Sequence, residues 1–276
     1  MPEKVIFFIL GSIIGSFLNV CIWRLPKDIS IIKPFSFCPK CKKTIKWYDN
    51  IPLLSFILLK ARCRYCKEKI SFRYPFVELL AGIFFVILYS KFGISLNFLK
   101  YAFFFMFLIV VSFIDIDYHA IPAYLCILAI AVALIFSFVK TVDLLKTTAV
   151  NIKALPIFKT LRNLIFGLGF TYFFKLFGDI FISIYLAIRK KDSIEGERES
   201  LGLGDVDFMG VVASFLGLQS AIIIFFLAPF IAIIYAIFAI IFKRSHLLPY
   251  LPYLSLASTV VFFWKEHILR FIGFNF

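Results

Sequence analysis

Long apolar runs alternate with short polar segments along this chain. Eight stretches approach the length of about 20 mostly apolar residues that an α-helix needs to cross a bilayer. These stretches are residues 5–23, 76–92, 97–115, 121–139, 160–188, 205–217, 219–242 and 254–273. The sixth is short and leaves Leu216 and Gly217 as a turn into the seventh, and the fifth is long enough to tilt or to break near Gly178. The pattern predicts an all-α polytopic membrane protein with about eight transmembrane helices.

Composition supports this fold class. Hydrophobic residues make up 62% of the 276 residues and charged residues 17%, whereas a soluble domain contains about 45–50% and about 25%. A soluble globular fold of this length could not bury so much apolar surface, so that class is excluded. Residues 1–23 have only Lys4 before the apolar run and no small-residue cleavage site after it, which indicates a first span rather than a signal peptide. No internal repeat at a fixed period is visible.

The formal net charge is +14, from 30 Lys and Arg against 16 Asp and Glu. In a soluble protein this excess would suggest a nucleic-acid partner, but in a membrane protein basic residues accumulate in cytoplasmic loops. Residues 24–74 hold 13 Lys and Arg and three acidic residues. The bias places this segment in the cytosol and the N-terminus outside, so the expected surroundings are the lipid bilayer and no nucleic acid is expected.

Four cysteines form two C-x2-C pairs separated by 21 residues: Cys38, Cys41, Cys63 and Cys66. Each pair can place two thiolates on one metal ion, and four thiolates with no open position are typical of structural zinc. Nearby basic residues are expected to lower the pKa of the thiols; they are Lys40, Lys42, Lys43, Arg62, Arg64 and Lys67. Two disulfides or unpaired thiols are the alternatives, and a cytosolic location disfavours disulfides. Cys21 and Cys126 lie inside apolar stretches, where they fill space.

Ionisable side chains inside membrane spans are costly and therefore indicate functional sites. The acidic candidates in and beside the spans are Glu78, Asp115, Asp117, Asp179, Asp205 and Asp207. Lys175 precedes Asp179 by four residues on one helix face, so a local ion pair is expected to account for Asp179.

Two of these carboxylates lie at predicted helix ends. Asp115 ends the third stretch, and Asp205 begins the sixth within Gly202-Leu203-Gly204-Asp205. The predicted topology puts both at the cytosolic membrane edge, where neighbouring carboxylates would share a proton. One could then activate water while the other polarises a peptide carbonyl. Gly202 and Gly204 would admit a substrate backbone and permit unusual φ and ψ; two unconnected helix-end acids facing water are the alternative.

Further segments follow one another in a specific order. They are Gly11 to Pro26 (GSIIGSFLNVCIWRLP), the four-cysteine loop with NIPLLS at 50–55, SFRYPFVELL at 71–80, IDID at 114–117 with Ile121-Pro122, GLGD at 202–205, and LPYLPY at 248–253. Together these segments resemble the bacterial type IV prepilin peptidase family, the bifunctional leader peptidase/N-methyltransferase group of GxGD aspartyl proteases. The resemblance covers most of the chain.

The resemblance implies a function and a division of labour. It implies cleavage of the short basic leader of prepilins and pseudopilins after a Gly, then methylation of the new N-terminus by S-adenosylmethionine, in pilus assembly or protein secretion. The catalytic aspartates would be Asp115 and Asp205, since the family uses the first acid of the D-x-D and residues two apart on a helix point to different sides. Residues 1–75 would form the methyltransferase-associated part, and residues 76–276 the peptidase in the bacterial inner (plasma) membrane with its active site on the cytosolic face.

The chain departs from the family pattern in three places. Asp207 stands where the family usually has Lys, Ala123 stands where it usually has Asp, and 90 residues separate the two aspartates, more than usual. The acid at 207 and the missing Lys are expected to affect the dyad or leader recognition.

Two further sets of residues are weaker candidates. Polar groups near the loop are methyltransferase candidates, with helix-end anchoring as the alternative role: Asn19, Arg24, Arg73 and Glu78. Because a basic cytosolic face would repel a basic leader, nearby acids are candidates for holding the leader. These acids are Asp117, Asp207, Glu195, Glu197 and Glu199.

Three rival functions remain open. A peptidase without methyltransferase activity would not need the four-cysteine loop. A proton-coupled transporter could use the intramembrane carboxylates, but no inverted repeat is visible and the GxGD lies at a span's edge. A zinc-loop scaffold without chemistry is the third.

Overall fold

The fold is built almost wholly from α-helices. The computed structural model describes residues 2–147, 155–189, 199–241 and 249–271. Within these ranges there is no β-strand, and the only extended pairing is two isolated bridges, Phe37 with Thr44 and Arg62 with Lys69. The predicted all-α class is confirmed.

Each of the eight predicted stretches is a helix. They are α1 (Pro2–Arg24), α3 (Arg73–Phe92), α4 (Leu96–Tyr118), α5 (Ala123–Thr147), α6 (Pro156–Arg189), α7 (Leu203–Leu216), α8 (Leu218–Ile241) and α9 (Leu251–Phe271). Six of them, all but α7 and α9, are long and apolar enough to cross a membrane. The 14 residues of α7 span about 21 Å at 1.5 Å per residue, and α9 is kinked at Trp264.

Of the two alternatives for the long fifth stretch, a tilt or a break near Gly178, the break is absent. The 34 residues of α6 form one helix through that position, about 51 Å long at 1.5 Å per residue. The predicted turn after α7 is confirmed, because Gly217 adopts a φ of 88° between α7 and α8. A side chain would be strained there, and glycine is not.

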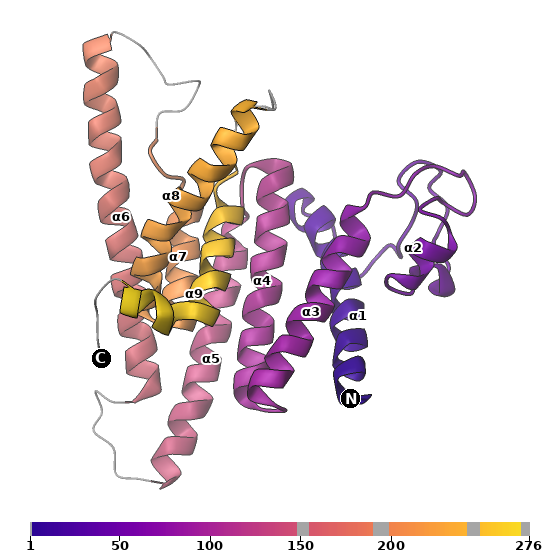
Figure 1. The fold of residues 1–276 in the computed structure, drawn as a ribbon, viewed down its shortest axis with the longest axis horizontal. Coiled ribbons are helices and arrows are strands. Elements are labelled where there is room, and N and C mark those ends of the chain that lie inside the picture. The colour runs from indigo at the N-terminus through magenta and orange to yellow at the C-terminus, as the bar shows by residue number, and fades with distance from the viewer. Residues whose placement is uncertain (1, 148–154, 190–198, 242–248, 272–276) are drawn as a thin grey trace. The chain divides into compact units, whose positions relative to one another are not determined.

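The chain divides into two compact units, residues 1–119 and 120–276. The first holds α1 to α4 and the second holds α5 to α9 (Figure 1). The functional boundary expected after residue 75 remains a prediction.

In the first unit, α1 packs most closely on α3 (Figure 1). A Cβ at Gly11 would lie 2.7 Å from the Ala81 carbonyl oxygen, and one at Gly15 would lie 2.7 Å from the Glu78 Cα. Two glycines four residues apart let helix backbones approach closely, as in many membrane helix pairs.

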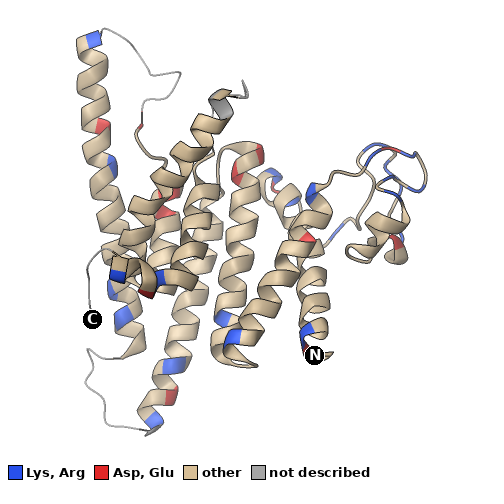
Figure 2. Ribbon diagram, viewed as in Figure 1, with Lys and Arg blue, Asp and Glu red and all other residues tan. Residues whose placement is uncertain are grey.

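Between α1 and α3, the chain forms a small lobe. It contains η1 (Leu25–Lys27), η2 (Trp47–Asn50) and α2 (Leu54–Leu58). Figure 2 shows Lys and Arg gathered along this lobe. Arg24 ties its start to α1, because the buried guanidinium donates to the Ser30 carbonyl at 2.8 Å and the Pro34 carbonyl at 2.7 Å.

In the second unit, α7 is the buried element. Its Phe208, Met209, Val211 and Val212 are almost wholly enclosed. α6 lies close against it, since a Cβ at Gly167 would meet the Ala213 Cβ at 2.4 Å. The helix that begins with the GxGD motif is therefore held on a well-packed core.

Candidate functional site

The four-cysteine lobe contains two turns of the same construction. In the first, the Lys42 N–H donates to the Cys38 carbonyl at 2.8 Å, and in the second the Lys67 N–H donates to the Cys63 carbonyl at 3.0 Å. Lys42 and Lys67 adopt left-handed φ values of 59° and 58°. The second turn thus has the same construction as the first turn and lies 25 residues further along the chain. This short internal repeat was not predicted from the sequence.

The two turns bring the four sulfurs together. One sulfur atom from each of Cys38, Cys41, Cys63 and Cys66 lies within 4.8 Å of the others, and the Cys38 and Cys66 sulfurs are 3.8 Å apart. A tetrahedral zinc ion with Zn–S bonds of about 2.3 Å needs sulfurs about 3.8 Å apart, whereas a disulfide needs about 2.05 Å. The donor set therefore fits zinc, and all six cysteines are free thiols.

Backbone groups lower the pKa of one of these thiols, and desolvation and neighbouring thiols raise the pKa of another, Cys66, to about 11. The N–H groups of Cys66 and Tyr65 lower the pKa of the Cys63 thiol to about 7. The nearby Lys and Arg side chains were expected to lower the pKa of the thiols, but for Cys63 the causes are backbone N–H groups and neighbouring thiols. Such N–H donation stabilises the thiolate that a metal requires.

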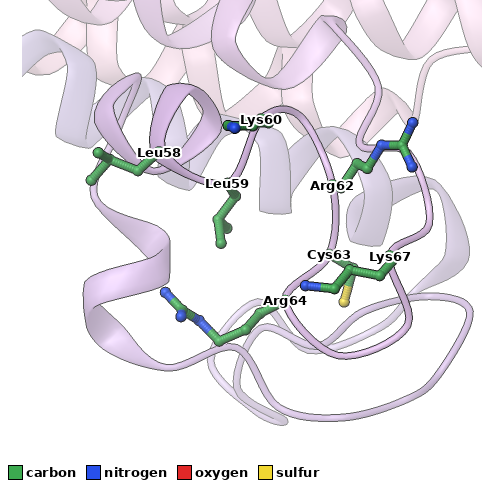
Figure 3. Close-up of a pocket in the computed structure, with 7 residues that line it drawn as sticks. All are labelled: Leu58, Leu59, Lys60, Arg62, Cys63, Arg64 and Lys67. Atoms are coloured by element: carbon green, nitrogen blue, oxygen red, sulfur yellow. The ribbon is translucent and has the colours of Figure 1, made fainter.

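Two ion pairs join segments of the lobe near the sulfurs. Lys40 pairs with Glu68, and Arg64 grips Asp49 with two hydrogen bonds of 2.7 and 2.6 Å. The Arg64 guanidinium holds the pKa of Asp49 below its usual range. A hollow of about 620 Å³ beside the cluster is lined by Leu58, Leu59, Lys60, Arg62, Cys63, Arg64 and Lys67 (Figure 3).

A second cavity, of about 380 Å³, lies between the lobe and helices α1 and α3. Two of the four clustered cysteines, Cys38 and Cys63, line its lobe side. Asn19 and Glu78 line its helix side, and both side chains are buried. With Arg24, three of the four methyltransferase candidates line this cavity, which has the size that small ligands occupy.

The two arginines among these candidates hold structural contacts. Arg24 also borders this cavity, but two of its nitrogens donate to backbone carbonyls of the lobe. Arg73 forms an ion pair with Asp117, which had been a candidate for holding the leader. These contacts match the anchoring role left open for both arginines.

Asp115 and Asp117 occupy different surroundings at the end of α4. Asp115 is 5% exposed, and its carbonyl accepts the N–H of His119, which ends the helix in a left-handed turn. Asp117 is more exposed and carries the ion pair with Arg73. The expectation that the two acids point to different sides is confirmed.

Asp205 lies in the first turn of α7. The Gly202 N–H donates to its carboxylate at 3.2 Å, and the Asp205 N–H donates to the Gly202 carbonyl at 3.1 Å. Gly202 has a φ of −67°, and Gly204 has no left-handed φ, so neither glycine uses the unusual φ and ψ that it would permit. A Cβ at Gly204 would meet nothing within 4 Å, which leaves open backbone beside Asp205.

A polar cluster on α6 holds the segment that leads into this motif. The buried Lys175 Nζ donates to Asp179 at 3.0 Å and to Glu199 at 2.6 Å. Asp179 in turn accepts the Ser200 N–H at 2.7 Å and the Ser200 hydroxyl at 2.8 Å. The predicted pair of Lys175 and Asp179 is confirmed, but Ser200 was missed because its partners are more than 20 residues away.

The remaining candidates for holding the leader differ in their surroundings. Asp207 is half-buried on α7. Glu199 shares Lys175 with Asp179. Glu195 and Glu197 lie outside the described residues.

Comparison with known proteins matches both units. Residues 9–92 match the family model described as the bacterial peptidase A24 N-terminal domain, and residues 102–237 match the model of the type IV leader peptidase family. The type 4 prepilin-like proteins leader peptide-processing enzyme of Escherichia coli O78:H11 is 34% identical over 270 residues, covering 90% of this chain and 89% of that one. The prepilin leader peptidase/N-methyltransferase of Vibrio cholerae is 30% identical over 268 residues, covering 94% and 96%.

A third relative matches over a shorter segment. The prepilin leader peptidase/N-methyltransferase of Myxococcus xanthus is 46% identical over 118 residues, which is 43% of this chain and 35% of that protein. No solved structure matches the chain.

Proposed function

Because the chain belongs to the type IV leader peptidase family, we propose that it removes the leader of type IV prepilins or pseudopilins and methylates the new N-terminus. The observation that carries this proposal is the full-length similarity to relatives named for these two activities. The separate matches of the two family models support a peptidase that also has the N-terminal part. A peptidase-only enzyme would give no function to the four-sulfur cluster and its adjoining cavity. A transporter would not explain these two features either.

Asp115 and Asp205 form the cleavage site in this proposal. One carboxylate takes a proton from water as the water oxygen attacks the scissile carbonyl carbon, and the protonated one donates to the carbonyl oxygen. The C–N bond then breaks, and the leaving nitrogen takes a proton and becomes the new N-terminal amine. The burial of Asp115 and the open backbone at Gly204 beside Asp205 support these roles.

Substrate geometry favours the cytosolic membrane edge for this chemistry. A prepilin carries a short basic leader followed by an apolar helix, so its scissile bond lies at the membrane surface. The positive-inside rule puts the basic lobe on the cytosolic side of the bacterial plasma membrane. Asp207, Glu195 and Glu197 are the acids proposed to attract the leader, while Asp117 and Glu199 already share their charge with Arg73 and Lys175.

Zinc and S-adenosylmethionine complete the proposed enzyme. The four sulfurs would hold a structural zinc ion that fixes the lobe. S-adenosylmethionine, when bound, supplies the methyl group. The methyltransferase part comprises the cavity that Asn19, Arg24 and Glu78 line, with Arg73 supporting the start of α3 through its pair with Asp117.

The test is a reaction of purified full-length protein with a synthetic prepilin and S-adenosylmethionine, followed by mass spectrometry. The expected product lacks the leader and carries one methyl group on its new N-terminus. A product that is cleaved but never methylated would favour the peptidase-only alternative. An intact prepilin under all conditions would contradict the proposal.

A further inference from the structure

The cavity between α1, α3 and the lobe contains two hydrogen-bond acceptors in a buried position. Asn19 is 5% exposed and Glu78 is 9% exposed, and both line the cavity. They face the same space because Gly15, one turn before Asn19, packs directly on the backbone of Glu78. The rest of the cavity wall includes aromatic side chains, such as Trp23, Phe37 and Phe56, and the basic residues Lys43, Arg64 and Lys69.

The orientation of the Asn19 amide is fixed by its donors. Its Nδ2 donates to the Gly15 carbonyl at 3.3 Å and to the Tyr74 carbonyl at 3.1 Å. Both partners are acceptors, so the nitrogen must face them and the oxygen must face away. That oxygen is buried and accepts no hydrogen bond from the described residues. A buried acceptor without a donor is costly and indicates a missing partner.

Glu78 lacks a cation of its own. Its Oε2 accepts the Leu53 N–H at 2.8 Å, and the Ser16 hydroxyl is a further donor. No ion pair reaches it from the described part of the chain, and Arg24 of the same cavity donates through two nitrogens to the lobe backbone. A carboxylate accepts about four hydrogen bonds, so Glu78 can still receive donors from a ligand.

We propose that Asn19 and Glu78 form a binding site for a primary ammonium group inside the methyltransferase cavity. A primary ammonium brings three N–H donors and one positive charge, which satisfies the orphan amide oxygen and neutralises the buried carboxylate. This inference rests on the proposed methylation. That reaction involves two primary ammonium groups, the α-ammonium of the methyl donor and the N-terminus of the cleaved substrate.

If the bound group is the N-terminus, Glu78 also has a chemical role. Its carboxylate takes one proton from the ammonium, and the freed nitrogen lone pair forms the N–CH3 bond while the S–CH3 bond of the donor breaks. The nitrogen becomes a secondary ammonium that keeps its other two protons and carries the positive charge, and the donor leaves as a neutral thioether. If the bound group is the donor's α-ammonium, Glu78 and Asn19 position the donor instead.

The test compares full-length wild type with Glu78→Gln, which keeps the shape of the side chain and removes its charge. Methylation of a pre-cleaved peptide is expected to fall at least about 30-fold in kcat/KM, as expected on loss of a buried charge partner. Glu78→Asp is expected to recover part of the rate. Glu3→Gln is the matched control, because Glu3 also joins α1 to α3, through Tyr89, outside this cavity.

Binding measurements distinguish the two sources of the ammonium. If the site holds the donor, Glu78→Gln weakens S-adenosylhomocysteine but not its analogue without the α-amino group. If it holds the peptide, S-adenosylhomocysteine binds equally and the change is confined to the peptide's KM and the pH profile of kcat.

Wild-type methylation by Glu78→Gln would overturn the ammonium site. Loss of methylation together with loss of zinc or of prepilin cleavage would also overturn it, because the role of Glu78 would then be structural. A wild-type protein that cleaves prepilin but never methylates would instead refute the proposed methyltransferase function.

Discussion

Single residues set the geometry of the sulfur cluster. Lys42 and Lys67 turn the chain back directly after each cysteine pair through their left-handed φ values. These turns place the sulfurs within reach of one metal ion, and in the second turn backbone N–H groups donate to the Cys63 sulfur. The cysteine spacing predicted this cluster because short spacing restricts a turn to few conformations. The identity of the donors that tune Cys63 depends on backbone orientation, which spacing does not encode.

Removal of zinc should separate the two activities. Purified protein is expected to hold about one zinc ion per chain, and Cys63→Ser is expected to lose it, because binding energy at such a site is folding energy. Methylation should then be lost, since Cys38 and Cys63 line the cavity, whereas cleavage should persist. Metal analysis and the two assays on one preparation check this.

Cys126→Ala is the control for this substitution, because Cys126 is buried in α5 and is not one of the four clustered cysteines. Metal-free wild-type protein with two intact disulfides would contradict the zinc assignment and the cytosolic location of the lobe.

At the scale of elements, the length of the apolar stretches predicted every long helix. It did not predict the contacts that fix the helix ends. The eight stretches became eight helices because about 20 apolar residues can satisfy their backbone only as helix in a membrane. A break near Gly178, one of the two alternatives for the fifth stretch, is absent, since one glycine costs a helix only about 1 kcal/mol. That glycine instead makes room for Ser200, whose Cβ would lie 2.5 Å from a Cβ at position 178. Contacts between residues far apart in sequence, such as Arg73 with Asp117, could not be predicted from one chain.

The Lys175 cluster on α6 should position the GxGD motif. Ser200→Ala removes the hydroxyl bonds to Asp179 and to the Lys175 carbonyl, and Lys175→Met removes both ion pairs. Each is expected to lower kcat for cleavage by about 10- to 100-fold, as expected from a misplaced catalytic group. KM and methylation of a pre-cleaved peptide should change little.

Ser183→Ala serves as the matched control, because the exposed Ser183 hydroxyl also lies on α6 and donates to the Asp179 carbonyl rather than to the Asp179 carboxylate. Equal kcat values for the Ser183 and Ser200 variants would show that the cluster does not position Asp205. Partial recovery in Lys175→Arg would support the ion pairs as the cause.

For the whole molecule, the distribution of charge affects how strongly the substrate binds. A net charge of +14 and a basic lobe repel a basic leader, and at physiological salt only charges within about 8 Å of the leader matter. Neutralising Asp207, Glu195 and Glu197 together should therefore raise KM for prepilin, most strongly at low salt, with a smaller change in kcat. Steady-state kinetics over a range of ionic strengths measure this. An unchanged KM at every salt concentration would mean that backbone contacts or anionic lipid hold the leader.

The central claim is that Asp115 and Asp205 together cleave the leader. The most direct measurement is prepilin cleavage by Asp115→Asn and Asp205→Asn, with methylation of a pre-cleaved peptide and zinc content recorded on the same samples. Both variants are expected to lose at least about 1,000-fold in kcat, because an amide cannot exchange the shared proton, while methylation and zinc are retained. Asp143→Asn, on an exposed position of α5, should cleave at the wild-type rate, and Asp117→Asn should retain clear activity. Robust cleavage by either the Asp115 or the Asp205 variant would contradict the aspartyl mechanism.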